Sequence, residues 1–187
     1  MRAMSYGVRD QQRSKVYDWE SYNCHRGYTK ANGFRGKLTE KQAQTLIKKT
    51  FDYWFRKEHS SRQLPRVTFR GGYHQAATAQ LDSVINLPPW SLYEPSVVLH
   101  ESAHAIQWRT RRSGLLEYDG GHGPNFCRIF IELLGHFEKH NRAELARSAK
   151  ASKIKVTPAL KIPRPKASTS KRKVEGIIKA ISATQVD

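Results

Sequence analysis

Residues 95–106 read Pro-Ser-Val-Val-Leu-His-Glu-Ser-Ala-His-Ala-Ile, and this stretch combines the signals of a helix start with two closely spaced histidines. Proline fits the first turn of a helix, so Pro95 predicts that a helix begins there. His100 and His104 are four residues apart, so on a helix their imidazoles lie one turn apart on the same face. The helix also carries apolar residues at Val97 and Val98, and Leu99, Ala103 and Ile106 form an apolar flank away from Glu101. An amphipathic helix of this kind would present both histidines to a cleft.

Glu101 completes the pattern H-E-x-x-H. Because an α-helix has 3.6 residues per turn, Glu101 is rotated by about 100° from His100. Its carboxylate can therefore stand beside an ion held by the two imidazoles without being a ligand itself. A base that takes a proton from a metal-activated water belongs in that place, so we expect Glu101 to be catalytic.

A catalytic zinc ion commonly has three protein ligands and one open position, so a third ligand is needed. In the extended pattern H-E-x-x-H-x-x-G-x-x-H, this chain has Gln107 and Thr110 at the glycine and last histidine positions, which excludes that class. We predict that the third ligand is His122, which has a glycine on each side and precedes a predicted helix. The acidic alternatives are Glu117, Asp119 and Glu132.

The flanking segments predict further helices and a small sheet. Thr39 and Gln42 have the spacing of a capping box. Residues 67–69 are expected to form a short strand, and the alternating pattern of residues 78–87 predicts a longer one. In chain order, further helices are expected within residues 9–25, over residues 39–59, beginning at residue 124 and over residues 143–150. We therefore predict an α+β, zincin-like fold with a small, mostly antiparallel sheet.

The chain divides into three predicted parts. Residues 1–37 form an N-terminal helical and loop segment, residues 38–140 the metallohydrolase core, and residues 141–187 a basic, largely disordered tail. No internal repeat is visible.

Charge and cysteine content indicate the partners and the compartment. The net charge is +17, from 33 basic and 16 acidic residues. Residues 150–187 hold 10 basic and 2 acidic residues, a net of +8, which leaves +9 on residues 1–149. This balance favours polyanionic partners, such as nucleic acid or an anionic surface. Cys24 and Cys127 are the chain's two cysteines, so we expect no disulfide framework. We expect a reducing, cytoplasmic location instead. The chain has no run of 18 apolar residues, so no membrane partner is expected.

The segment His100-Glu-x-x-His104, followed by His122-Gly-Pro-x-Phe-Cys127, resembles the SprT/Spartan group of zinc peptidases. The resemblance covers roughly residues 95–137. It implies that the three histidines hold Zn²⁺ and that Glu101 is the general base.

A second resemblance concerns residues 9–17, Arg-Asp-Gln-Gln-Arg-Ser-Lys-Val-Tyr. They are similar to a putative metallohydrolase family of actinobacteria and their phages. The chain departs from Spartan-like proteins after the core, because it has no cysteine-based zinc ribbon and no recognisable ubiquitin- or clamp-binding motif.

The expected function is zinc-dependent hydrolysis of a peptide bond in a protein or peptide, including nucleic-acid-associated proteins. Four side chains are candidates for stabilising the oxyanion of the transition state, although each also fits a structural role: Tyr73, His74, Tyr93 and Tyr118. Two other functions stay open. One is a nucleic-acid-binding protein with a structural zinc site, and the other is an amidohydrolase acting on non-peptide substrates.

Overall fold

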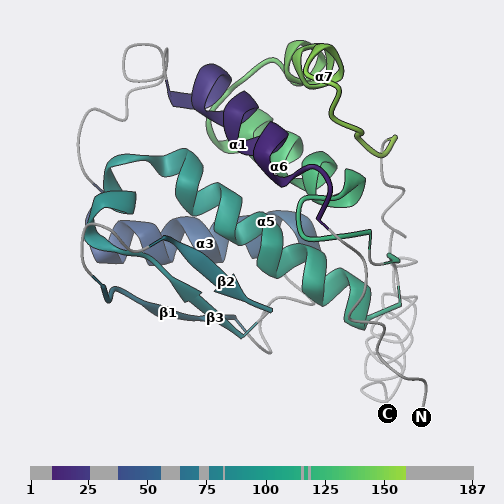
Figure 1. The fold of residues 1–187 in the computed structure, drawn as a ribbon. Helices are drawn as coiled ribbons and strands as arrows, with labels where there is room; N and C mark the ends of the chain where they lie inside the picture. The colour runs from purple at the N-terminus through teal and green to yellow at the C-terminus, as the bar shows by residue number, and fades with distance from the viewer. Residues whose placement is uncertain are drawn as a thin grey trace, which may run out of the picture.

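The computed structural model describes residues 10–25, 38–55, 64–71, 76–81, 83–114, 116–117 and 119–158. In this part of the chain the fold is α+β, as predicted, with helices packed beside a three-stranded sheet (Figure 1). The α-helices are α1 (Arg13–Glu20), α3 (Glu40–Phe55), α5 (Pro95–Arg112), α6 (Pro124–Phe137) and α7 (Arg142–Ala151). Two shorter helical segments are the π-helical turn η1 (Ser21–His25) and the 3-10 helix η2 (Pro89–Tyr93).

The sheet is mixed, so the prediction of a mostly antiparallel sheet has to be corrected. Its strands are β1 (Arg66–Thr68), β2 (Thr78–Gln80) and β3 (Val84–Asn86), in the order β1-β3-β2. The central strand β3 runs parallel to β1 and antiparallel to β2. Strand β2 therefore lies at one edge of the described sheet.

The prediction of one strand over residues 78–87 was wrong, because the chain reverses at Leu81. Leu81 has a φ of 55°, and the Ser83 N–H donates to the Gln80 carbonyl oxygen at 3.2 Å. The two halves of the segment then pair with each other as β2 and β3. Tight hairpin turns usually place glycine or asparagine at positive φ. Because the residue here is leucine, the turn has no such signal in the sequence.

Helix α5 lies in the middle of the fold and contacts α3, α6, β2 and β3 (Figure 1). Its start at Pro95 confirms the predicted one. The predicted apolar flank is buried, with Leu99, Ala103 and Ile106 fully inaccessible to solvent. Because α5 has neighbours on several sides, His100 and Glu101 are buried as well.

Helix α3 begins with the predicted capping box. The Thr39 N–H donates to Gln42 Oε1 at 2.8 Å, and the Gln42 N–H donates to Thr39 Oγ1 at 3.2 Å. Phe51 on α3 is fully buried, and the Arg109 guanidinium of α5 lies over its ring at 4.8 Å. The end of α5 is thus held against α3. The predicted last residues of this helix, 56–59, lie outside the described residues.

Both outer segments of the described chain join the core. Val16 and Trp19 of α1 and Leu145 and Ala149 of α7 belong to the same buried cluster as the central helices. Trp19 Nε1 donates to Ser148 Oγ at 2.9 Å, which ties α1 to α7. The predicted loop at 26–37 and residues 159–187 of the predicted tail lie outside the described residues. Among the helices described, none has the length and hydrophobicity that crossing a membrane would require.

Candidate metal centre

The structure brings His100, His104 and His122 together. His100 and His104 lie one turn apart on α5, and His122 lies in the turn that precedes α6. His100 Nε2 is 3.2 Å from His104 Nε2 and 3.2 Å from His122 Nε2. The potential ligand atoms of all three residues lie within 4.8 Å of one another. These three side chains could hold a metal ion.

Two carboxylates from the N-terminal segment fix the outer nitrogens of this cluster. Glu20 Oε2 accepts from His100 Nδ1 at 2.8 Å, and both side chains are almost completely buried. Asp10 Oδ2 accepts from His122 Nδ1 at 2.6 Å, and Asp10 Oδ1 accepts from the His122 N–H at 3.2 Å. Metal-binding histidines typically donate their second ring nitrogen to such a carboxylate.

The protonation pattern that follows from these hydrogen bonds fits a cation. When the rings of His100 and His122 are neutral and donate through Nδ1, their Nε2 atoms carry lone pairs. Two unprotonated nitrogens cannot hydrogen-bond each other, so with these tautomers a cation bound between them would make their approach favourable. For a tetrahedral zinc site with Zn–N bonds of 2.0–2.1 Å, adjacent nitrogens are about 3.3 Å apart. The observed separations of 3.2 Å are close to that value.

The turn that carries His122 depends on close backbone approaches. A Cβ at Gly123 would collide with the backbone and side chain of Asp119, and a Cβ at Gly121 would lie 2.8 Å from Asp10 Oδ2. Asp119 in turn accepts from the Asn125 N–H at 2.7 Å, at the start of α6. Gln12 Nε2 donates to the His122 carbonyl oxygen at 3.1 Å. The turn is therefore fixed both by α6 and by the segment before α1.

Aromatic rings bound the cluster on two sides. Phe126, fully buried on α6, stacks on His104 with ring centroids 4.2 Å apart and contacts the other two imidazoles edge-on. Tyr17 of α1 is 41% exposed and stacks on His100 at 5.6 Å with an interplanar angle of 10°. Its ring also meets His122 edge-on at 5.0 Å. Phe126 closes the inner side of the cluster, and Tyr17 lies on the side that faces solvent.

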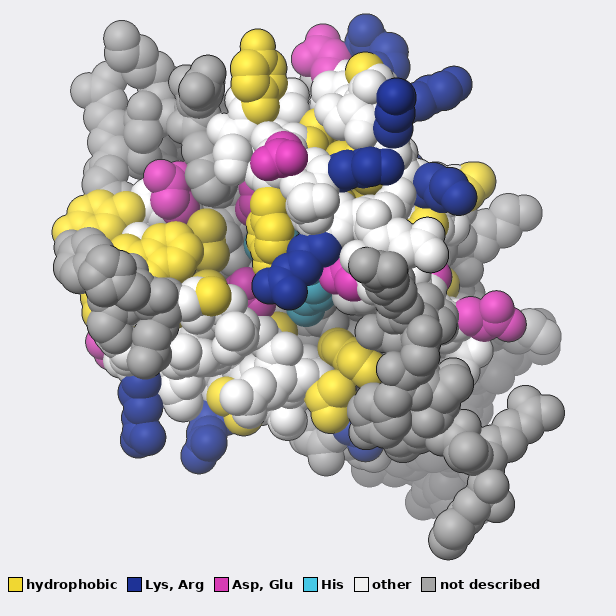
Figure 2. Space-filling model, in the orientation of Figure 1, with side chains coloured by type: hydrophobic (Ala, Val, Ile, Leu, Met, Phe, Trp, Pro, Cys, Tyr) yellow, Lys and Arg dark blue, Asp and Glu magenta, His cyan; other side chains and the backbone are white. Residues whose placement is uncertain are grey.

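Glu101 and His100 line the same cleft, which has a volume of about 290 Å³. The other side chains and backbone that line it come from α1, η1, η2, the start of α5 and the chain before β2, and include Arg13, Tyr17, Glu20, Ala77 and Trp90. Figure 2 shows this face, with a hollow near its centre where a histidine is visible beneath a basic side chain and between acidic ones. The predicted base and one predicted ligand therefore meet the same space.

Burial raises the pKa of the Glu101 carboxyl to about 7. The charge of His100 and a hydrogen bond from the Ala79 backbone N–H oppose this rise, and the nearby Glu20 carboxylate adds to it. Ala79 belongs to β2, so the edge of the sheet holds the Glu101 side chain in place. Near neutral pH this carboxyl can both accept and release a proton.

The three histidines of the cluster differ in the direction of their pKa shifts. Burial and the charges of His100 and His122 hold the pKa of His104 well below its usual value. Burial also lowers the pKa of His122, although Asp10 opposes the effect. For His100, burial acts in the same direction, but the charge and hydrogen bond of Glu20, together with the charge of Glu101, outweigh it and the pKa is raised. His104 and His122 thus favour the neutral form that a metal ligand needs.

Two of the acidic alternatives to His122, Asp119 and Glu132, have other partners. Asp119 accepts from the N–H of Asn125 and from Gln107 Nε2, at the start of α6. Glu132 pairs with Arg128 at 2.6 Å and with Arg142 at 2.9 Å. None of Glu117, Asp119 and Glu132 belongs to the ligand cluster found among the described residues. Of the four expected oxyanion candidates, Tyr93 lies in η2, and Tyr73, His74 and Tyr118 lie outside the described residues.

Sequence reasoning missed Asp10, Arg13, Tyr17 and Glu20. Asp10 is 112 residues from His122, and Glu20 is 80 residues from His100. A signal was present in the spacing of Arg13, Tyr17 and Glu20, which places them along one face of a helix.

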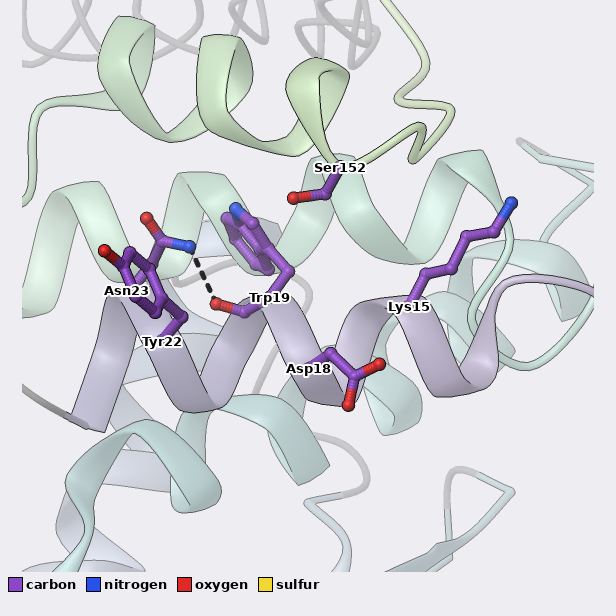
Figure 3. A pocket seen from close by; sticks show the side chains of 6 residues that line it. All are labelled: Lys15, Asp18, Trp19, Tyr22, Asn23 and Ser152. Atoms are coloured by element: carbon purple, nitrogen blue, oxygen red, sulfur yellow. Dashed lines mark hydrogen bonds between the residues drawn. The ribbon is translucent and has the colours of Figure 1, made fainter.

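The opposite face of α1 borders a second hollow of about 260 Å³, shown in Figure 3. Its lining consists of Lys15, Asp18, Trp19, Tyr22, Asn23 and Ser152. The Asn23 side chain donates to the Trp19 carbonyl oxygen at 2.8 Å there. The described residues of this lining include no histidine and a single carboxylate, so they do not resemble the centre on the other face.

Comparisons of the chain with protein-family models, with curated proteins and with solved structures gave no match. The chemistry of the histidine cluster and its cleft is therefore the basis for inferring the function.

Proposed function

We propose that this protein is a zinc-dependent metallohydrolase, and specifically a SprT-like peptidase. The observation that carries the proposal is the convergence of three imidazole Nε2 atoms beside a cleft that Glu101 also lines. Three neutral imidazoles suit several transition metals, and zinc is the one commonly used for hydrolysis with three protein ligands. When bound there, zinc would supply Lewis acidity for activating water and polarising a carbonyl group.

The chain's own residues would handle the proton and the geometry. Glu101, oriented by the Ala79 N–H, takes a proton as the water oxygen forms its bond to the carbonyl carbon. It then gives that proton to the leaving nitrogen as the C–N bond breaks. Glu20 and Asp10 keep His100 and His122 oriented throughout.

The position of β2 supports an extended peptide as the substrate. β2 is an edge strand of the described sheet, and Ala77, just before it, lines the cleft. Ala77 directly precedes β2 and is two positions from Ala79, whose N–H donates to Glu101. An extended peptide could pair with the backbone at Ala77, while Ala79 engages Glu101. Cleavage of proteins associated with nucleic acid would suit the net charge of +17.

Metal analysis tests the ligand set. We expect one zinc ion per purified full chain, and a loss of binding in His122→Ala. His136→Ala is the matched control, because His136 stacks on Tyr53 at 4.0 Å, away from the cluster. Zinc retention by His122→Ala, or a different metal in the wild type, would contradict the proposed centre.

Glu101→Gln separates a hydrolase from a nucleic-acid-binding protein whose zinc is structural. Labelled casein is incubated with the zinc-loaded full chain, with and without double-stranded DNA. We expect turnover by the wild type and a loss of about 10²-fold or more in Glu101→Gln, with the zinc content unchanged. A wild type that binds zinc tightly but cleaves no protein would refute peptidase activity. Turnover of small N-acyl amino acids instead of casein would favour the amidohydrolase alternative.

A further inference from the structure

Among the tyrosines that the structure describes, Tyr17 contacts the cluster of His100, His104 and His122. Its ring covers His100 in a near-parallel stack and meets His122 edge-on. It also lines the cleft together with His100 and Glu101. Because it is 41% exposed, Tyr17 stands between the cluster and the solvent, where a substrate would have to approach.

Arg13 lies one helical turn before Tyr17 and also lines the cleft. Its guanidinium carbon is 5.6 Å from the centroid of the Tyr17 ring, and the guanidinium hydrogen-bonds the Tyr17 hydroxyl. A guanidinium can only donate, so the phenol oxygen is the acceptor in this bond and its O–H stays free to donate elsewhere. Donation to the phenol oxygen also polarises that O–H and strengthens it as a donor.

The reaction proposed above needs such a donor. As water adds to a carbonyl carbon, negative charge develops on the carbonyl oxygen, and a fixed hydrogen-bond donor stabilises that charge. Glu101 cannot do this, because it accepts the proton from water. Of the tyrosines expected for the role, only Tyr93 is among the described residues, and it is absent from the lining of this cleft.

We propose that Tyr17 is a catalytic residue that donates a hydrogen bond to the developing oxyanion, and that Arg13 is the positioning residue that orients it. The proposal rests on the hydrolase function proposed above. It adds a part of the active site that comes from the first helix of the chain. Tyr17 keeps its proton throughout, so the proton transfers by Glu101 remain balanced without it.

The test uses the zinc-loaded full chain and compares Tyr17→Phe with Tyr22→Phe. Tyr22 is 70% exposed, lies in η1 and borders the hollow of Figure 3 on the opposite side of the helix. Both variants lose only a hydroxyl group. Three quantities are measured: zinc content, the split of casein-peptide turnover into kcat and KM, and the Kd for a phosphonamidate analogue of the cleaved peptide. The phosphonamidate carries the negative, tetrahedral oxygen that the transition state develops.

For Tyr17→Phe we expect kcat to fall by about 10²-fold, which is the effect of removing one oxyanion donor. KM should change little, the phosphonamidate should bind more weakly by a comparable factor, and the zinc content should stay the same. Tyr22→Phe should match the wild type in all three. Unchanged kcat and phosphonamidate affinity in Tyr17→Phe would overturn the proposal. A loss of zinc that accounts for the loss of rate would overturn it too, because Tyr17 would then act on the metal centre.

Arg13 is tested through Tyr17. Arg13→Met should lower kcat, and Arg13→Lys should restore part of it. In the Tyr17→Phe background, Arg13→Met should cause no further loss, since a residue that acts through another is not additive with it. Additive losses would refute the positioning role. If the wild type has no turnover, the hydrolase function fails and this inference fails with it, whereas an active wild type with an equally active Tyr17→Phe refutes the inference alone.

Discussion

Glu20 provides a quantitative test of whether the N-terminal helix belongs to the metal centre. Its carboxylate is 2.8 Å from His100 Nδ1, and the two side chains are 5% and 3% exposed. Loss of such a carboxylate typically weakens metal binding by about 10–100-fold, or about 1.4–2.7 kcal/mol. The near-complete burial of Glu20 places it at the upper end, because water cannot take over the lost hydrogen bond.

Three substitutions separate charge from hydrogen bonding. Glu20→Gln keeps an acceptor oxygen and loses the charge, so we expect zinc affinity to fall by about 10-fold. Glu20→Ala also leaves a buried N–H without a partner, so we expect about 100-fold. Asp10→Asn should have a smaller effect of about 3-fold, because the Asp10 side chain is 27% exposed and solvent compensates.

The assay is competition for zinc between the full chain and a chromophoric chelator at fixed pH and ionic strength. Asp18→Asn is the matched control, since Asp18 lies on the same helix and borders the hollow on its other face. Circular dichroism checks that each variant is folded. A Glu20→Ala protein that is folded and binds zinc within 2-fold of Asp18→Asn would refute the role assigned to Glu20.

Three further substitutions test how the centre is held. Gly123→Ala forces a Cβ onto the backbone and side chain of Asp119, so we expect a loss of about 1–3 kcal/mol in the free energy of unfolding together with weaker zinc binding. Gly135→Ala displaces the Arg142 side chain from its ion pair with Glu132, away from the histidines, so any loss of stability in urea denaturation should leave zinc binding unchanged. Gln12→Ala removes hydrogen bonds to the backbone of His122 and Lys155, so we expect the free energy of unfolding to fall by about 1–3 kcal/mol. Amide hydrogen exchange at Lys155 should become faster. Unchanged exchange there would argue against a stabilising role of Gln12. Phe126→Ala opens a cavity under the three imidazoles and should cost about 3–5 kcal/mol in denaturant unfolding, while a cost below about 1 kcal/mol would show that Phe126 does not support the cluster.

Local sequence patterns were enough to predict where several helices begin. Pro95 and Pro124 marked the starts of α5 and α6, and the capping box at Thr39 marked the start of α3. Helical spacing of four residues placed His100 and His104 on one face. Each of these signals acts within a turn or two of helix, where the number of possible conformations is small. The choice of His122 needed only the chain order of a loop and a helix after the motif.

Tertiary structure alone decided which distant residues complete the centre. Nothing local at Asp10 or Glu20 shows that their partners are His122 and His100, because those contacts form only when α1 packs across α6 and α5 (Figure 1). The hairpin at Leu81 was hidden for a related reason, since alternation reports which side chains are buried and not where the chain turns. The order of polar and apolar residues along the chain indicates whether each residue is buried, but not which distant residue it contacts. The pairing of residues 80 or more positions apart arises from how the buried faces fit together in space.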